Sequence, residues 1–252
     1  MQMNGQRWGL GSMLKVLALG WLALGALVAQ AADFSVGRVE VEFAEEGWRE
    51  VPLPDTSRAF GGDRNGVLAV QSKLYIWGAP DSDEQSLVLV SANSQGLGGG
   101  RGGYMTYSPN CRSDDQNYRE GNEGFKASFM QCLMVTPLYG SKGVFEALAP
   151  QVLDLQTSGQ VSVQGPIYTV WSRHAISTGS FLDVRVFVRS PLGAAGAVVE
   201  ETLPTGIRPE QVAWGRQLKD AVKSSVYSLS GRLAIPPIRP APLVQNTPVG
   251  GG

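Results

Sequence analysis

Residues that usually build enzymatic and metal-binding sites are scarce in this sequence. Its 252 residues include a single histidine, His174, and two cysteines, Cys111 and Cys132, which are not arranged as CxxC. Zinc sites and thioredoxin-like redox pairs with that spacing are therefore excluded. The sequence also has no GxSxG elbow, no HExxH pair and no P-loop, the local signatures of several hydrolases and nucleotide-binding enzymes. We expect no bound metal or cofactor.

An excess of charge of either sign is also missing. The chain has 21 Lys and Arg residues against 22 Asp and Glu residues, a formal net charge of −1. Binding to a nucleic-acid backbone needs clustered basic residues, because neutralising the phosphates supplies much of the affinity. Nucleic acid is therefore not an expected partner.

The N-terminus has the composition of a cleavable secretory signal. Residues 1–15 contain two basic residues and no acidic one, residues 16–28 form an uncharged apolar run, and the sequence AQA follows at residues 29–31. This order of regions is typical of secretory signals. A membrane anchor is the alternative, but about 20 apolar residues are needed to span a bilayer and this run is shorter. We expect residues 1–31 to be removed and the remaining chain, without a transmembrane segment, to be periplasmic or secreted.

Export changes the interpretation of the two cysteines. Disulfides persist in the periplasm and outside cells but are rare in the cytosol, so a bridge between Cys111 and Cys132 is predicted. We call residues 104–138, which contain both cysteines, the middle segment. Closing a loop of roughly 20 residues stabilises the folded state by about 3 kcal/mol in the chain-entropy model.

Residues 104–123 form the longest polar excursion in the chain, and we predict that they contact a protein partner in the cell envelope. Long loops within compact domains are usually functional or disordered, and tyrosine is enriched at protein interfaces. The candidate partner-binding residues are Tyr104, Tyr107, Tyr118, Asp114 and Asp115.

Two ligand-binding alternatives exist for this region. Asp114, Asp115, Glu120 and Glu123 are acidic, but they do not keep the alternate spacing of a calcium loop, so a solvated acidic loop is favoured. The glycine-rich residues 96–103 match GxGxxG after a predicted strand. A phosphate-binding loop must open a helix, whereas the residues that follow are aromatic and end in proline. A surface loop is the simpler interpretation.

Alternation of apolar and polar residues predicts a sheet of mainly antiparallel strands. The two clearest pairs are residues 67–77 with 85–92 and residues 160–176 with 180–189. Further strands are predicted at residues 34–43, 48–53 and 125–135, with polar loops at residues 55–66 and 104–123.

One long helix is predicted over residues 208–231. Pro209 is at its first position and Gly231 lies just past its end, an asymmetry that is typical of helix termini. The helical spacing of the apolar residues places Leu229 on the buried face. The basic residues Arg216, Lys219 and Lys223 fall on the opposite face, which is expected to be solvated.

The predicted fold class is α+β, with an antiparallel sheet and a long C-terminal helix packed across it as a two-layer sandwich. A weaker helical pattern predicts one short helix over residues 141–156, interrupted by Pro150. Residues 32–235 are expected to form a single domain. Residues 236–252 are rich in proline and glycine, a composition that favours an extended or disordered tail.

The function predicted from these features is that of an exported, non-catalytic binding or accessory protein. An exported hydrolase is one alternative, with His174 as general base and Asp183 of the facing strand as its orienting group. A carrier of small ligands is another, because aromatic clusters line such sites. The aromatic candidates are Trp48, Tyr75, Trp77, Tyr104, Tyr107 and Trp171.

Overall fold

The structure is a computed structural model that describes residues 34–60, 66–79, 85–93, 111, 116–122, 129–138, 155, 158–161, 167–176, 180–189, 192 and 202–238. The chain divides into two units, Met1–Gln30 and Ala31–Gly252, and all described residues belong to the second. The predicted signal and, apart from Leu155, the predicted short helix therefore lie outside the described residues.

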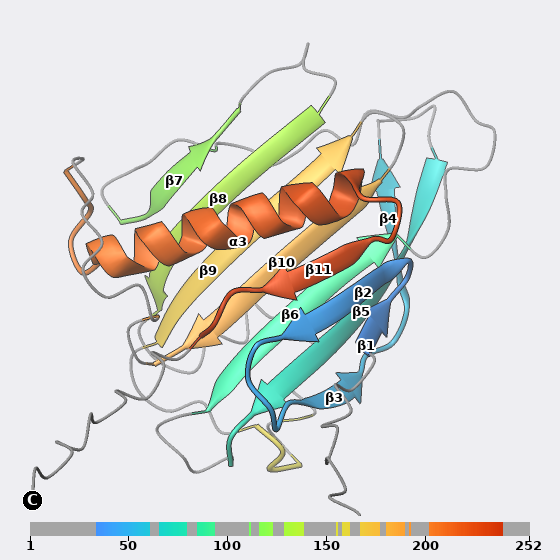
Figure 1. The fold of residues 1–252 in the computed structure, drawn as a ribbon, viewed down its shortest axis with the longest axis horizontal. Coiled ribbons are helices and arrows are strands. Elements are labelled where there is room, and N and C mark those ends of the chain that lie inside the picture. The colour runs from blue at the N-terminus through green and yellow to red at the C-terminus, as the bar shows by residue number, and fades with distance from the viewer. Residues whose placement is uncertain are drawn as a thin grey trace, which may run out of the picture. The chain divides into compact units, whose positions relative to one another are not determined.

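A large antiparallel sheet forms most of the described fold (Figure 1). Its strand order is β3-β5-β6-β10-β9-β8-β7, and β4 also pairs with β5. The strands are β3 (Arg49–Pro52), β4 (Thr56–Phe60), β5 (Gly66–Trp77), β6 (Ser86–Asn93), β7 (Tyr118–Gly121), β8 (Phe129–Leu138), β9 (Ile167–Ile176) and β10 (Phe181–Val188).

The two predicted hairpins are confirmed. Strand β5 pairs with β6 and β9 pairs with β10, both antiparallel. In each pair the apolar residues that alternate along the sequence lie on the same face, as a strand period of two requires. Two short strands of this sheet were missed, because β4 and β7 fall within the predicted polar loops at residues 55–66 and 104–123.

A second sheet consists of β1 (Phe34–Val36), β2 (Val39–Phe43) and β11 (Arg232–Ile235). The predicted strand over residues 34–43 is divided into β1 and β2 by a turn at Gly37, which has a φ of 60°. Strand β11 is parallel to β2. Gly231 precedes β11 with a φ of 67°, and a Cβ atom there would lie 2.4 Å from the Arg38 carbonyl oxygen. Glycine is therefore needed where the chain meets the β1–β2 turn.

The single helix in the described part of the chain is α3 (Pro209–Tyr227), which has 19 residues and packs against β8, β9 and β10 (Figure 1). It begins as predicted at Pro209, and the Gln211 side chain accepts a hydrogen bond from the Arg208 backbone N–H at 3.0 Å. It ends earlier than predicted, since Ser228 is the C-cap. The prediction for Leu229 is wrong, because this side chain is fully exposed.

A smaller hydrophobic cluster lies on one face of the large sheet, and the main core lies on the face that α3 covers. Its largest side chain, Trp214, is 1% exposed, and its indole N–H donates to the Pro237 carbonyl at 2.7 Å. Ile238 also belongs to this core and is 4% exposed. The described core therefore includes Ile238, while residues 239–252 of the predicted tail lie outside the described residues.

Candidate functional site

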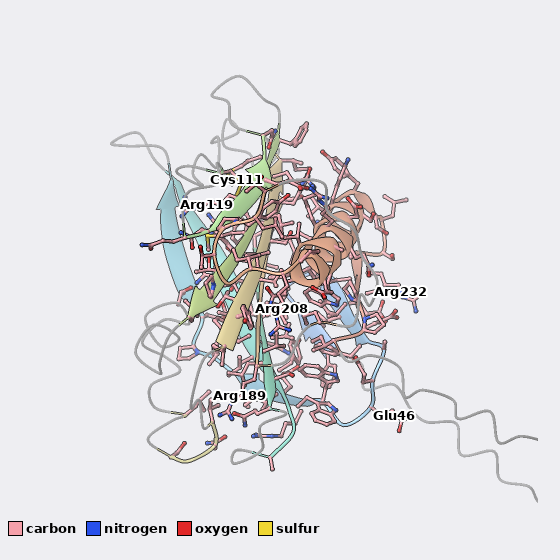
Figure 2. All side chains as sticks on the ribbon, turned by 90° about the vertical axis from the view of Figure 1, so that its left-hand side faces the viewer. Glu46, Cys111, Arg119, Arg189, Arg208 and Arg232 are labelled. Atoms are coloured by element: carbon pink, nitrogen blue, oxygen red, sulfur yellow. A yellow bond between two sulfur atoms is a disulfide. The ribbon has the colours of Figure 1, made fainter. Side chains whose placement is uncertain are left out.

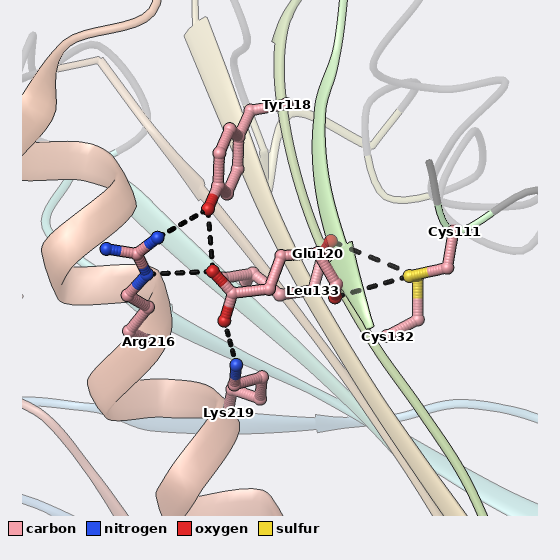
Figure 3. Close-up of polar contacts among 7 residues, drawn as sticks. All are labelled: Cys111, Tyr118, Glu120, Cys132, Leu133, Arg216 and Lys219. Carbon is pink, nitrogen blue, oxygen red and sulfur yellow. Dashed lines mark hydrogen bonds and ion pairs between the residues drawn. A yellow bond between two sulfur atoms is a disulfide. The ribbon is translucent and has the colours of Figure 1, made fainter. Parts of the chain in front are cut away.

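Strand β7 lies in the described part of the predicted contact loop, and it is attached to β8 and to α3. It pairs with β8, with Tyr118 opposite Val135 and Gly121 opposite Cys132. The Tyr118 side chain is 3% exposed and points toward α3 (Figure 3). Its hydroxyl donates to Glu120 at 2.6 Å and accepts from the Arg216 guanidinium at 2.8 Å. Tyr118 therefore fixes β7 to the helix.

Glu120 is the centre of an ion-pair network between β7 and α3 (Figure 3). One carboxylate oxygen accepts from Arg216 Nε at 2.8 Å, and the other from Lys219 Nζ. The Glu120 and Lys219 side chains are 22% and 19% exposed, so solvent screens their pair only in part. Burial lowers the pKa of Lys219, with nearby Lys223 acting in the same direction and Asp220 opposing it.

The predicted disulfide between Cys111 and Cys132 is confirmed, with the two Cα atoms 5.7 Å apart. Both cysteines are buried. The bridge lies on the side of β7 and β8 that faces away from α3 (Figures 2 and 3). Gly121 allows the disulfide to pack directly against β7. A Cβ atom at this position would lie 2.6 Å from Cys111 Sγ and 2.2 Å from the Gln131 carbonyl oxygen.

Asn122 closes the far end of the β7–β8 pair. Its side-chain amide donates to the Phe129 carbonyl at 2.9 Å, and its side-chain oxygen accepts from the Gln131 backbone N–H at 2.6 Å. The Asn122 backbone N–H also donates to the Gln131 carbonyl at 3.1 Å. These bonds fix the end of β7 to the beginning of β8.

Among the five predicted partner-binding residues, the structure describes only Tyr118. Tyr104, Tyr107, Asp114 and Asp115 lie outside the described residues. Tyr118 is described, but its buried ring and bound hydroxyl make it a structural residue rather than an exposed anchor.

Arg216 and Lys219 were expected on a solvated helix face, and their pairing with Glu120 was missed. The only sequence signal for it is the spacing of Tyr118 and Glu120, which places two polar groups on one face if the region is a strand.

The proposed pair of His174 and Asp183 is not formed. In the β9–β10 register His174 is opposite Leu182, whereas Asp183 is opposite Arg173. Neighbouring strand residues point to opposite faces, so the imidazole faces α3 and the Asp183 carboxylate faces away from it. Neither ring nitrogen of His174 has a hydrogen-bond partner among the described residues. Asp183 therefore cannot orient this histidine.

Asp183 is instead the centre of a buried polar cluster on the opposite face. Its carboxylate accepts from Arg173 Nε at 2.9 Å, from the Trp171 indole N–H at 2.8 Å and from Arg185 Nε at 3.3 Å. Both guanidinium groups also lie over the Trp171 ring, at 4.9 and 5.3 Å from its centroid. The cluster is a satisfied network that holds β9 and β10 together.

The predicted aromatic site is divided by the large sheet. Trp48 stacks on Phe43 at 4.2 Å, and Phe43 contacts Tyr75 at 5.2 Å, on the face that carries α3. Trp171 lies on the other face with Asp183. Trp77 donates its indole N–H to the Glu46 carbonyl. The described aromatic candidates therefore do not line one common site.

In the described part of the chain, no group of three or more His, Cys, Asp or Glu residues is arranged to hold a metal ion. No helix there has the length and apolar character needed to cross a membrane. Comparisons with protein families, with curated proteins and with solved structures find no significant match to this chain.

Proposed function

We propose that this chain is an exported, non-catalytic binding or accessory protein that contacts another protein of the cell envelope through its middle segment. The contact residues in this proposal are Tyr104, Tyr107, Asp114 and Asp115. Tyr118, which the sequence also suggested, holds β7 to α3 instead.

The observation that carries the proposal is the attachment of the middle segment to rigid elements from two sides. The disulfide ties Cys111 to β8 on one side of the sheet, and the Glu120 network ties β7 to α3 on the other. Only residues 112–115 separate Cys111 from the described residues that lead into β7. Loops held on a rigid scaffold commonly carry recognition, and such restraint reduces the ordering entropy that opposes binding.

Export of the mature chain is part of the same proposal. The N-terminal pattern supports it, and the division of the chain into units falls between Gln30 and Ala31, next to the expected cleavage site. A buried disulfide is compatible with an oxidising compartment.

For the fold, we propose the two-layer sandwich with its long C-terminal helix in the second layer. In support, α3 contacts β8, β9 and β10, and β1 contacts β5 and β6. The second sheet and the helix also share one hydrophobic cluster with the large sheet. Both observations favour the helix and the small sheet lying side by side over one face.

Site-specific photo-crosslinking in living cells tests the proposed function. A photoreactive residue at Tyr107 or Asp114 should yield a crosslink to the same envelope protein. The matched control is a photoreactive residue at Ser224, which is exposed on α3. Equal crosslinking of that protein from Ser224, or none from Tyr107 and Asp114, would contradict the proposal. Mass spectrometry of the chain recovered from the periplasm tests removal of residues 1–31 separately.

A further inference from the structure

His174 joins the end of α3 to the beginning of β8. Its side chain is fully buried on the face of β9 that α3 covers. The ring stacks on Phe129 at a centroid distance of 5.7 Å and meets the edge of Tyr227 at 5.3 Å. Phe129 is the first residue of β8 and Tyr227 is the last residue of α3. One imidazole therefore connects two element ends that are distant in sequence.

The surroundings of His174 stabilise only its neutral form. Among the described residues, α3 presents Lys223 and Tyr227 to the ring, while β8 presents Phe129 and Gln131, and β10 presents Leu182. None of these side chains is a carboxylate. Burial, with a smaller contribution from Lys223, lowers the His174 pKa from 6.5 to about 4. A buried cation without a partner is strongly unfavourable.

The last turn of α3 is more exposed than the middle of the helix, and its buried anchor is Ser225, whose hydroxyl donates to the Gly231 carbonyl at 2.9 Å. Tyr227 is 56% exposed, and Leu229, just beyond the helix, is fully exposed. Earlier in the helix Trp214 is buried, and Gly215 allows such close approach that a Cβ atom would lie 3.0 Å from Leu133. Elements with few buried contacts open at a lower free-energy cost than the core. Release of the last turn is therefore the least costly way to hydrate a protonated His174.

We propose that His174 is an acid-sensitive latch, whose protonation releases the last turn of α3 from β9 and loosens the start of β8, which belongs to the middle segment. The proton comes from solvent and binds to the imidazole, and no other group changes its protonation. The conformational claim stands on the geometry around His174. Its consequence, weaker presentation of the contact residues in acid, rests on the proposed function.

The direction and size of the effect follow from linkage. The closed state has the lower His174 pKa, so its stabilisation is complete above pH 6.5 and is lost as the pH falls toward 4. If the opened histidine titrates at 6.5 and the closed one at about 4, opening becomes roughly 20-fold more favourable at pH 5 than at pH 7. The effect increases further as the pH approaches 4.

Hydrogen exchange of the chain as purified from its cells, corrected for intrinsic pH dependence, tests the latch. Between pH 7 and pH 5, peptides covering residues 222–231 and 129–131 should lose protection by about 20-fold. The β5–β6 hairpin should not change. In His174→Phe, which keeps the ring contacts but cannot be protonated, the change should be less than 3-fold. Equal acid opening in His174→Phe, or the same loss of protection in all three regions, would overturn the proposal.

A second variant keeps the test decisive if His174→Phe does not fold. Lys223 disfavours protonation of the closed His174, so Lys223→Gln raises the closed-state pKa toward 6.5 and should reduce the loss of protection between pH 7 and pH 4. A loss of protection that is unchanged or larger would refute the latch. Hydrogen exchange needs no partner, so a negative exchange result contradicts the latch alone. A negative crosslinking result would contradict the proposed function and leave the latch intact.

Discussion

Substitution of Glu120 by glutamine is the sharpest test of how the middle segment is held. The substitution keeps the shape of the side chain and removes the charge that Arg216 and Lys219 share. Both cations then lose their counter-charge at the surface between β7 and α3. Tyr118 is left with an altered hydrogen-bond partner beneath the helix.

The expected cost follows from the exposure of each partner. Glu120 and Lys219 are 22% and 19% exposed, so their pair is worth about 1–2 kcal/mol, more than the 0.2–1 kcal/mol of a fully solvated pair. Arg216 is 36% exposed, and its pair adds about 0.5 kcal/mol. We expect Glu120→Gln to lower the free energy of unfolding by about 2 kcal/mol, measured by urea denaturation.

The matched control is Glu42→Gln in the second sheet. Glu42 pairs with Arg232, whose side chain is 61% exposed, so the expected loss is below about 0.5 kcal/mol. A double-mutant cycle between Glu120 and Lys219 should give a coupling energy of about 1 kcal/mol. If Glu120→Gln costs no more than Glu42→Gln, or the cycle gives no coupling, the network does not fix β7 and the reasoning is refuted.

Three further substitutions test other parts of the account. Cys132→Ser should lower the free energy of unfolding by about 3 kcal/mol, because the bridge spans 21 residues; equal urea midpoints with and without the bridge would contradict this. Asp183→Asn should cost about 3–5 kcal/mol, since Arg173 keeps its charge in a buried site, and a loss under 1 kcal/mol in the same assay would count against a buried ion pair. Gly121→Ala should cost about 1–3 kcal/mol and slow formation of the disulfide in an oxidative refolding assay, because its Cβ atom would overlap the Gln131 carbonyl; wild-type behaviour in both measurements would show that packing of the disulfide against β7 does not need glycine.

The long strands were predictable because their apolar pattern extends over eight or more residues. Residues 67–77 and 85–92 therefore indicated the β5–β6 hairpin. Short strands have too few residues to show an apolar pattern. Strand β7 has four residues in a polar region, and β11 has four residues shortly after a helix. The helix start was marked by Pro209, but Gly231 misled the prediction of its end, because that glycine serves the contact with Arg38.

In the candidate site, only the disulfide was predictable from the sequence. The Cys111–Cys132 bridge followed from the expected compartment and from the presence of only two cysteines. The Glu120 network joins residues 96 and 99 positions apart, and no local pattern reports such a pairing. The failed pair of His174 and Asp183 has a similar cause. A shift of one residue in strand register moves a side chain to the other face, and sequence does not fix register to that accuracy.

If the middle segment carries the recognition surface, as we propose, substitutions in it should lower the affinity for the crosslinked envelope protein. One variant carries Tyr107→Ala, Asp114→Asn and Asp115→Asn. The control carries Gln217→Ala, Asp220→Asn and Ser224→Ala on the exposed face of α3. Measured by isothermal titration calorimetry, Kd should increase at least about tenfold for the first variant and less than about twofold for the control, because a few anchor residues supply most of the binding energy. Equal Kd values for the wild type and the first variant, both folded with unchanged Tm, would contradict it.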